Sequence, residues 1–390
     1  MPQPRRAAST ELKQSARISS SRIRNVKVWD TVVVGGGIIG LALALDLRGH
    51  GQSVIVLDAS QPGREASWAA GGMLAARDPE TKPALRELAI ASAEIYPEFI
   101  HQIQDESGTP VDFRTDGAIR FLLPKELANC ALPLLTEIEL HELEPNLGYT
   151  APAVFLEESC VDPRLLLPAL VEAAKHHEVD IASGAEVQEI EVVNDRAIAA
   201  ITTKTRYPGA AIVNCAGAWS AQIGPLRIPT RPVKGQMLAL APLVTPVNLT
   251  TPKRLVHHVI RGDVYIIPRG DGRIVVGSTS EDAGYNKRVD APTIQNLHQS
   301  AANLVPAIGE ARILEDWAGL RPGTPDGLPI LGRTEVDAYY VATGHYRDGI
   351  LLAPITAKLM SRLIRGQDPE LDISHFRLNR FQTSETRQAK

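Results

Sequence analysis

Apolar and polar positions near the N-terminus follow a strand-helix-strand pattern. An apolar run at residues 31–34 leads into a glycine-rich turn at 35–40, and a second apolar run at 53–57 ends at Asp58. The apolar stretch between them predicts a helix from Ile38 to about Gly49, flanked by two buried strands. This order, with an acidic residue closing the second strand, is typical of a unit that binds a dinucleotide.

Each glycine of the turn has its own role in such a unit. Gly35 permits the tight turn, Gly37 lets the backbone approach a pyrophosphate, and Gly40 lets the helix pack on the strand. The Asp58 carboxylate is placed to accept the ribose hydroxyls. A glycine-rich turn without a ligand is the alternative, which the complete pattern disfavours. The predicted contacts are Gly35, Gly37, Ile38, Ile39, Gly40, Asp58 and Ala59.

A run of small residues at 63–74 follows where a nicotinamide enzyme would continue with alternating strands and helices. Its lack of bulk would let backbone amides lie against an extended dinucleotide such as FAD. A flexible surface loop is the alternative, but Trp68 and Leu74 are apolar and unfavourable in solvent. The predicted cofactor contacts here are Ala66, Ser67, Gly71, Gly72 and Met73.

The rest of the chain alternates between two patterns. Helices at about 85–99 and 163–176 and strands at 187–193, 197–203 and 211–214 continue the nucleotide-binding rhythm. Strand patterns dominate 232–280, including Val256 to Ile260, and 270–272 is a hairpin turn. A helix at about 292–305, a strand at 341–345 and a helix from Ile350 to Ile364 complete the prediction.

These patterns predict an α/β protein in which a discontinuous Rossmann-like FAD-binding domain carries an inserted α+β substrate domain, built on a mainly antiparallel sheet. The FAD-binding domain is assigned to residues 29–100, 150–225 and 312–370. The substrate-binding domain is assigned to residues 101–149 and 226–311. Residues 1–28 hold many basic side chains against one acid, Glu11, and are predicted to be a disordered tail.

The composition limits the classes of molecule that the protein is expected to bind. The net charge of −4 and the pI of about 6.2 give no basic excess for nucleic acid, and no apolar run is long enough to span a bilayer. Three distant cysteines fit a reducing compartment, which predicts a cytoplasmic protein. They lack metal-ligand spacing, as do the pairs 176–177 and 257–258 of histidines, so no metal is expected. A homo-oligomer is compatible with these features.

Six segments between Val32 and Arg365 resemble the D-amino-acid oxidase superfamily of FAD enzymes, and within it the thiamine-pathway glycine oxidases. Two of them are specific to the glycine oxidases: WAGLRPGT at 317–324 and GHYRDGILLAP at 344–354. The other four are the turn at 35–40, EASWAAGGML at 65–74, VNCAGAW at 213–219 and PVKGQ at 232–236.

The resemblance implies roles for residues at matching positions. Arg321 would hold the substrate carboxylate, Tyr265 would hydrogen-bond it, and Arg347 would lie near flavin and substrate. A guanidinium also suits this task chemically, because it forms two parallel hydrogen bonds to a planar anion. An ion pair with Asp316 or Asp326 is the alternative for Arg321. Further implied flavin contacts are Val187, His345, Tyr346, Arg347, Asp348, Gly349, Ile350 and Leu351.

The chain departs from the family pattern at the pocket rim. Asp263 and Ser280 stand where the family carries histidine and methionine, so the preference among glycine, sarcosine and small D-amino acids is open. No cysteine follows Cys215, so the cysteinyl flavin of related sarcosine oxidases cannot form at its usual C-terminal site. The FAD is therefore expected to be non-covalent.

The resemblance implies oxidative deamination, in which hydride passes from the substrate Cα to the flavin, molecular oxygen becomes hydrogen peroxide and the imine can serve thiazole assembly for thiamine. Arg321 and Tyr265 would act mainly by alignment, with the redox chemistry supplied by the flavin. Two alternatives stay open. One is a D-amino-acid or proline-type dehydrogenase that uses a quinone or flavoprotein acceptor, and the other is a non-catalytic FAD-binding subunit of a complex.

Overall fold

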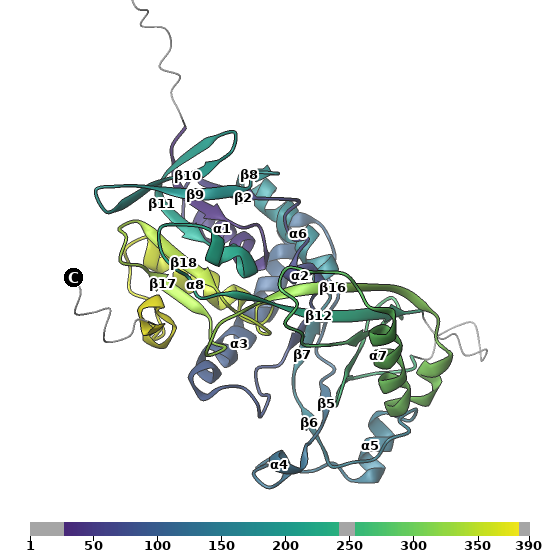
Figure 1. The fold of residues 1–390 in the computed structure, drawn as a ribbon. Coiled ribbons are helices and arrows are strands. Elements are labelled where there is room, and N and C mark those ends of the chain that lie inside the picture. The colour runs from purple at the N-terminus through teal and green to yellow at the C-terminus, as the bar shows by residue number, and fades with distance from the viewer. Residues whose placement is uncertain (1–26, 242–253, 382–390) are drawn as a thin grey trace, which may run out of the picture.

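The computed structural model describes residues 27–241 and 254–381, which form two large sheets, a small sheet and the helices that cover them (Figure 1). The predicted basic tail lies outside the described residues, apart from Lys27 and Val28.

An eight-stranded sheet forms the nucleotide-binding half. Its order is β17-β18-β11-β1-β2-β8, and β10 joins β11 while β9 pairs with β10. β18, β11, β1, β2 and β8 run parallel, so their carboxyl ends meet at one edge. The bounds are β1 Trp29–Val34, β2 Val54–Asp58, β8 Asp180–Ser183, β9 Val187–Val193, β10 Arg196–Thr202, β11 Arg206–Asn214, β17 Ile330–Arg333 and β18 Tyr339–Thr343.

The two faces of this sheet are covered differently. Val33 points into the core formed with four helices, whereas Val32 and Val34 point to the other face and pack with Val187 of β9. Alternate strand residues face opposite sides, so the all-apolar β1 contributes to both cores. The four helices are α1 Ile38–Gly49, α3 Pro83–Ser107, α6 Pro163–His176 and α8 Ala353–Ile364.

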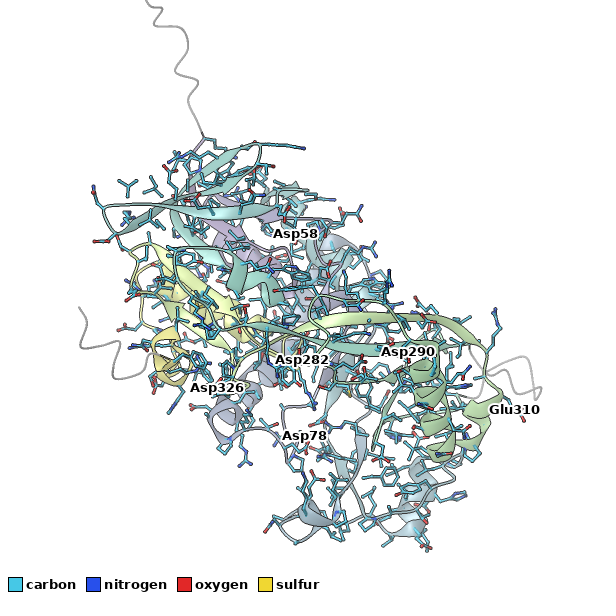
Figure 2. All side chains as sticks on the ribbon, in the orientation of Figure 1. Asp58, Asp78, Asp282, Asp290, Glu310 and Asp326 are labelled. Carbon is cyan, nitrogen blue, oxygen red and sulfur yellow. The ribbon has the colours of Figure 1, made fainter. Side chains whose placement is uncertain are left out.

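A seven-stranded sheet, in the order β16-β12-β15-β14-β13-β5-β6, forms the other half. All neighbours are antiparallel except β5 and β13. Helix α7, Ala291–Leu304, packs on one face, and Figure 2 shows its N-cap Asp290 on this half and Asp58 on the other. The strands are β5 Ala118–Phe121, β6 Ala153–Leu156, β12 Arg231–Leu240, β13 Val259–Arg261, β14 Tyr265–Pro268, β15 Ile274–Gly277 and β16 Ile313–Gly323.

The opposite face of the seven-stranded sheet turns toward the small-residue loop at 63–74. Met237 and Ile267 on this face share a core with Ala69, and Met73 packs against it. Short elements complete the fold: the three-stranded sheet β3-β7-β4, helix α2, and helices α4 and α5, which lie between β5 and β6 in the chain. They are β3 Met73–Leu74, β4 Phe113–Arg114, β7 Ser159–Val161, α2 Ala66–Ala69, α4 Pro124–Leu127 and α5 Glu137–Leu143.

The predicted fold class is confirmed. β6 and β16 lie within segments that the sequence predicts to be part of the FAD-binding domain, and both pair within the seven-stranded sheet. β16 pairs with β12 from Arg231↔Gly323 to Leu240↔Ile313, a long-range pairing that local sequence does not encode. The domain boundaries stay a proposal.

Two predicted elements begin later than expected. The helix predicted from Ile350 begins at Ala353, because Pro354 has no N–H to continue the hydrogen-bond ladder back to the Ile350 carbonyl. The strand predicted from Val256 begins at Val259, because the N–H groups of His257 and His258 donate to the Glu144 carboxylate, at 2.8 and 2.6 Å.

Candidate active site

Two glycines of the nucleotide-binding turn have no room for a side chain. Gly35 has a φ of +106°, and a Cβ there would lie 2.5 Å from the carbonyl oxygen of Cys215. A Cβ on Gly40 would lie 2.0 Å from the carbonyl oxygen of Gly35. The turn and the close approach of α1 to β1 therefore both require glycine, as predicted from the sequence.

Gly37 differs, because the space beside it is open. The nearest atom to its Cβ position is the Ser67 hydroxyl oxygen, at 3.4 Å. That hydroxyl accepts a hydrogen bond from the N–H of Ile38, at 3.1 Å, at the start of α1. An open cradle beside the free N–H groups of a helix N-terminus fits the pyrophosphate of a dinucleotide.

Asp58 closes β2 at the same edge of the sheet. One carboxylate oxygen accepts from the N–H of Gly36 and the other from that of Ser60, both at 2.8 Å. These bonds fix the carboxylate and leave lone pairs for ribose hydroxyls. Ala59 next to it is exposed, while Val187 is buried and packs with Leu57.

The loop after α2 lies against the seven-stranded sheet. A Cβ on Gly71 would come within 2.8 Å of the Ile267 side chain and 3.3 Å of the Tyr265 ring. The Trp317 indole donates to the Ala69 carbonyl at 3.1 Å, and Arg269 donates to the Gly71 carbonyl at 2.8 Å. These contacts bring the predicted cofactor loop beside Tyr265, which the sequence places far away.

Arg321 projects from β16 and is held by the segment that follows β15. Its Nη1 donates to the Thr279 carbonyl at 3.0 Å, and its Nη2 donates to the Ser278 hydroxyl at 2.6 Å. Of the two acidic partners considered from the sequence, Asp316 and Asp326, the second instead pairs with Arg380 at 2.7 Å. The geometry therefore leaves the charge of Arg321 for an anion that approaches from outside this segment.

Tyr265 lies next to this arginine site. Tyr265 pairs with Gly277 and Gly277 pairs with Met237, so the three share one face of the sheet. A Cβ on Gly277 would lie 2.7 Å from the Tyr265 hydroxyl oxygen, and the next residue, Ser278, contacts Arg321. The hydroxyl donates to the Met237 sulfur at 3.4 Å, a weak acceptor.

The turn after β18 completes the site. The N–H of Tyr346 donates to the Pro322 carbonyl at 3.1 Å, which joins this turn to the end of β16. The Arg347 guanidinium lies 5.3 Å from the centre of the Tyr346 ring. Burial acts to raise the pKa of Tyr346, but the hydrogen bond with Ser280 and the charges of Arg347 and Arg321 outweigh it and lower the pKa.

Burial shifts the pKa values of two side chains in this turn, His345 and Asp348. Burial lowers the pKa of His345 to about 3, so the imidazole is neutral, and its Nε2 lies 3.1 Å from the Thr356 hydroxyl. Burial raises the pKa of Asp348 to about 6; Asp78 adds to the rise, and Arg347 and Lys82 oppose it. Shifted titratable groups beside a predicted cofactor site are typical of active sites.

The structure thus brings many of the predicted residues together in two groups. Gly35 to Gly40, Asp58 and Ser67 line the nucleotide cradle, while Tyr265, Arg321 and the turn at 345–351 lie around the neighbouring sheet face. Their individual roles stay predictions. Residue patterns do not indicate which residues hold Arg321 or support the residues that do, although the PVKGQ motif at 232–236 covers three of them. These residues are Lys234, Gly235, Gln236, Ser278, Thr279 and Glu281.

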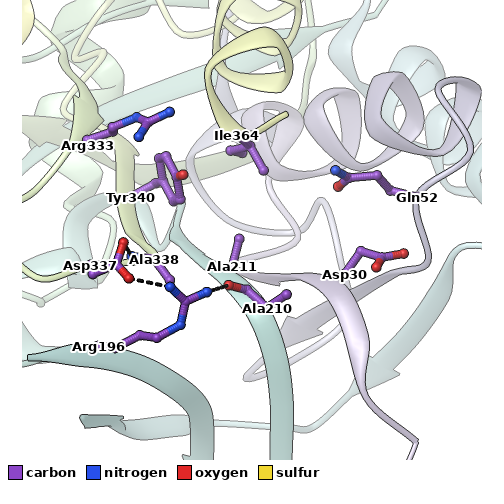
Figure 3. A pocket seen from close by; sticks show the side chains of 10 residues that line it. All are labelled: Asp30, Gln52, Arg196, Ala210, Ala211, Arg333, Asp337, Ala338, Tyr340 and Ile364. Carbon is purple, nitrogen blue, oxygen red and sulfur yellow. Dashed lines mark hydrogen bonds and ion pairs between the residues drawn. The ribbon is translucent and has the colours of Figure 1, made fainter. Parts of the chain in front are cut away.

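A cavity of about 330 Å³ lies elsewhere, at the amino ends of the parallel strands (Figure 3). Asp30 of β1, Tyr340 of β18 and the Arg196–Asp337 ion pair are among its lining residues. Gly35 and Gly344 follow the carboxyl ends of β1 and β18, and Asp58 is the last residue of β2. Ligands bind at these carboxyl ends in open α/β sheets. The cavity is therefore separate from the candidate active site.

The nucleotide cradle, the parallel sheet and the second sheet facing it define the class of FAD-dependent oxidoreductases. The family model described as DAO, FAD dependent oxidoreductase, matches residues 30–363, and the chain belongs to this family. The matched residues include every predicted site residue.

Comparison with individual proteins gives three close similarities. The chain is 34% identical to the bifunctional protein ThiO/ThiG of Trichormus variabilis, over 90% of this chain and 55% of that protein. It is 30% identical to the hydrogen cyanide synthase subunit HcnC of Pseudomonas aeruginosa, over 91% and 97%. The crystal structure of glycine oxidase from Geobacillus kaustophilus matches with a TM-score of 0.83 and 30% identity, over 90% and 98%.

The chain spans about half the length of the ThiO/ThiG relatives that it matches. Within residues 27–241 and 254–381, no helix combines the length and apolar character needed to cross a membrane.

Proposed function

We propose that this protein oxidises glycine and other small amino acids, such as sarcosine and D-alanine, at the Cα–N bond. The observation that carries the proposal is the position of Arg321. Its guanidinium is fixed by Thr279 and Ser278, at 3.0 and 2.6 Å, beside the hydroxyl of Tyr265 and the loop at Gly71. The similarity to glycine oxidase supports the same substrate class.

Each side chain has a proposed task. Arg321 binds the substrate carboxylate through paired N–H groups, and Tyr265 turns its hydroxyl from the Met237 sulfur to the same carboxylate. Arg347, which lies over the Tyr346 ring, adds positive charge beside the proposed substrate site. Together they orient Cα, so alignment rather than a side-chain base is the contribution of the protein.

FAD, when bound, supplies the two-electron acceptor for this chemistry. The oxidation removes two electrons and two hydrogens from the Cα–N bond of glycine, and molecular oxygen finally takes both as hydrogen peroxide. Water adds to the resulting imine, which releases the oxo acid and ammonia. We propose non-covalent FAD, because every cysteine precedes residue 216 and Cys215 is buried against the glycine turn.

The similarity to ThiO/ThiG proteins supports a role of the imine product in thiazole assembly for thiamine. The free cysteines Cys130, Cys160 and Cys215 support a reducing compartment, so we propose the cytoplasm. The HcnC similarity favours a second candidate, in which the chain is one FAD-binding subunit of a larger complex. A dehydrogenase with a quinone or flavoprotein acceptor is the third.

A substrate panel separates these candidates. Purified holoenzyme is incubated in air with glycine, sarcosine, D-alanine and D-proline, and peroxide and ammonia are measured. The proposal expects one peroxide for each ammonia released from glycine. Turnover only with an added dye would instead identify a dehydrogenase, and no turnover with or without dye would favour the subunit of a complex.

A further inference from the structure

The segment 278–281, which holds Arg321, is itself fixed to β12 by charged side chains. The backbones of Lys234 and Glu281 exchange two hydrogen bonds of 2.9 Å each, which forms an isolated bridge. The Lys234 ammonium lies 3.2 Å from the Glu281 carboxylate. Side chain and backbone therefore both anchor the end of this segment.

Three side chains donate to, or pair with, the Glu281 carboxylate. One carboxylate oxygen accepts from Gln236 Nε2 at 2.9 Å and from the Thr279 hydroxyl, and the other faces Lys234. Burial acts to raise the pKa of Glu281, but these three partners outweigh it and lower the pKa. Glu281 therefore stays charged at neutral pH.

Two partners of Glu281, Lys234 and Gln236, are buried, and Gln236 makes a further hydrogen bond. Lys234 is 5% exposed and Gln236 is 1% exposed. The Gln236 side-chain oxygen accepts from the N–H of Asp290, at 2.7 Å, which ties the cluster to the start of α7. A buried lysine needs a partner charge, so this pair is costly to break on one side only.

Thr279 connects this cluster to Arg321. Its hydroxyl donates to Glu281 and accepts from the Gln236 N–H at 2.9 Å, while its carbonyl accepts from Arg321 Nη1 at 3.0 Å. Because two hydrogen bonds fix the Thr279 hydroxyl, the Thr279 carbonyl is held in one orientation toward Arg321. A guanidinium that is already oriented loses less conformational entropy when it binds a carboxylate.

We propose that Glu281, charge-paired with Lys234, is a positioning residue that acts through Thr279 to hold Arg321 in the geometry that binds the substrate carboxylate. The inference rests on the proposed function, because it assumes that Arg321 binds substrate. Glu281 itself touches neither substrate nor cofactor in this account.

The test uses holoenzyme with glycine and compares Glu281→Gln with the paired variant Lys234→Met/Glu281→Gln, which leaves no buried charge alone. In both variants we expect KM for glycine to rise about tenfold, kcat to change less than about threefold and FAD content to stay unchanged. The dissociation constant of acetate, measured from the flavin absorbance, should rise by the same factor as KM. Thr279→Ser, which keeps the hydroxyl, should retain the KM of the natural protein.

A double-mutant cycle decides the result. In an Arg321→Ala background, Glu281→Gln should change kcat/KM by less than about twofold, because the residue through which it acts is gone. Equal effects in both backgrounds would overturn the inference while leaving the role of Arg321 intact. An Arg321→Ala variant with unchanged KM would instead overturn the proposed function, and the inference with it.

Discussion

Gly235 lies directly beneath the guanidinium of Arg321. A Cβ on Gly235 would come within 2.4 Å of both terminal nitrogens of Arg321, which stands on the neighbouring strand. Close approach of the arginine to the sheet therefore depends on the missing side chain at this position.

Replacement of Gly235 by alanine should displace Arg321 without unfolding the sheet, because the atoms that must move are the far end of a flexible side chain. We expect KM for glycine to rise about tenfold, with the melting temperature within about 3 °C of the natural protein. Steady-state kinetics and a thermal melt check this. The control is Gly49→Ala, where no atom lies within 4 Å of the new Cβ; equal KM in the two variants would contradict the expectation.

The open space beside Gly37 predicts a variant that folds but loses cofactor. Its φ of −72° is accessible to any residue, and only the Ser67 hydroxyl lies near the Cβ position. Gly37→Val should therefore keep the far-UV circular dichroism of the natural apoprotein but lose most bound FAD, since the side chain occupies the proposed pyrophosphate position. Flavin absorbance after gel filtration measures the loss. Full FAD occupancy in the variant would show that the pyrophosphate does not lie beside Gly37.

Among the residues that the structure describes, the hydroxyl of Tyr265 has only the Met237 sulfur as its hydrogen-bond acceptor, at 3.4 Å. Tyr265→Phe should raise KM for glycine about tenfold, the effect of one lost hydrogen bond to a charged group, about 1.5 kcal/mol. A matched control is Tyr285→Phe, whose hydroxyl donates to the Ala218 carbonyl at 3.0 Å. If both variants kept the KM of the natural protein, Tyr265 would have no part in carboxylate binding.

Asp348 should give the apoprotein a measurable pH dependence. Its pKa is raised from 3.8 to about 6 in the folded state, so its carboxyl favours folding most below pH 4 and loses this contribution as pH rises through 6. Asp348→Asn should therefore stabilise the apoprotein at pH 7, by about 1 kcal/mol more than at pH 5. Urea unfolding at the two pH values checks the difference. The same gain at both values would contradict the raised pKa.

The sequence predicted the local parts of this structure well. The turn at Gly35 to Gly40, helix α1 and helix α6 lie where the residue patterns place them, because turn and helix geometry depend on neighbouring residues. The family resemblance led to Arg321 and Tyr265, but not to their surroundings. Neither periodicity nor spacing indicates that Gly235 underlies Arg321, or that Glu281 forms an ion pair with the buried Lys234, because both depend on long-range strand pairing.

The same limit explains the displaced elements. Whether residues at 313–323 continue the nucleotide-binding sheet or join the second one is decided by their pairing with β12, more than 70 residues earlier in the chain. Glu144 is buried and accepts hydrogen bonds from the N–H groups of His257 and His258, so the strand predicted from Val256 begins only at Val259. No motif links this carboxylate to the histidine pair.

The most direct test of the central claim is reduction of the bound flavin by glycine in the absence of oxygen, compared between the natural protein and Arg321→Ala. This measurement does not depend on the final electron acceptor. We expect glycine to bleach the flavin absorbance of the natural protein, and Arg321→Ala to retain FAD but to need about 100-fold more glycine for half-maximal reduction. No bleaching of the natural protein by glycine, sarcosine or D-alanine, or equal bleaching of the variant at the same concentrations, would contradict this expectation.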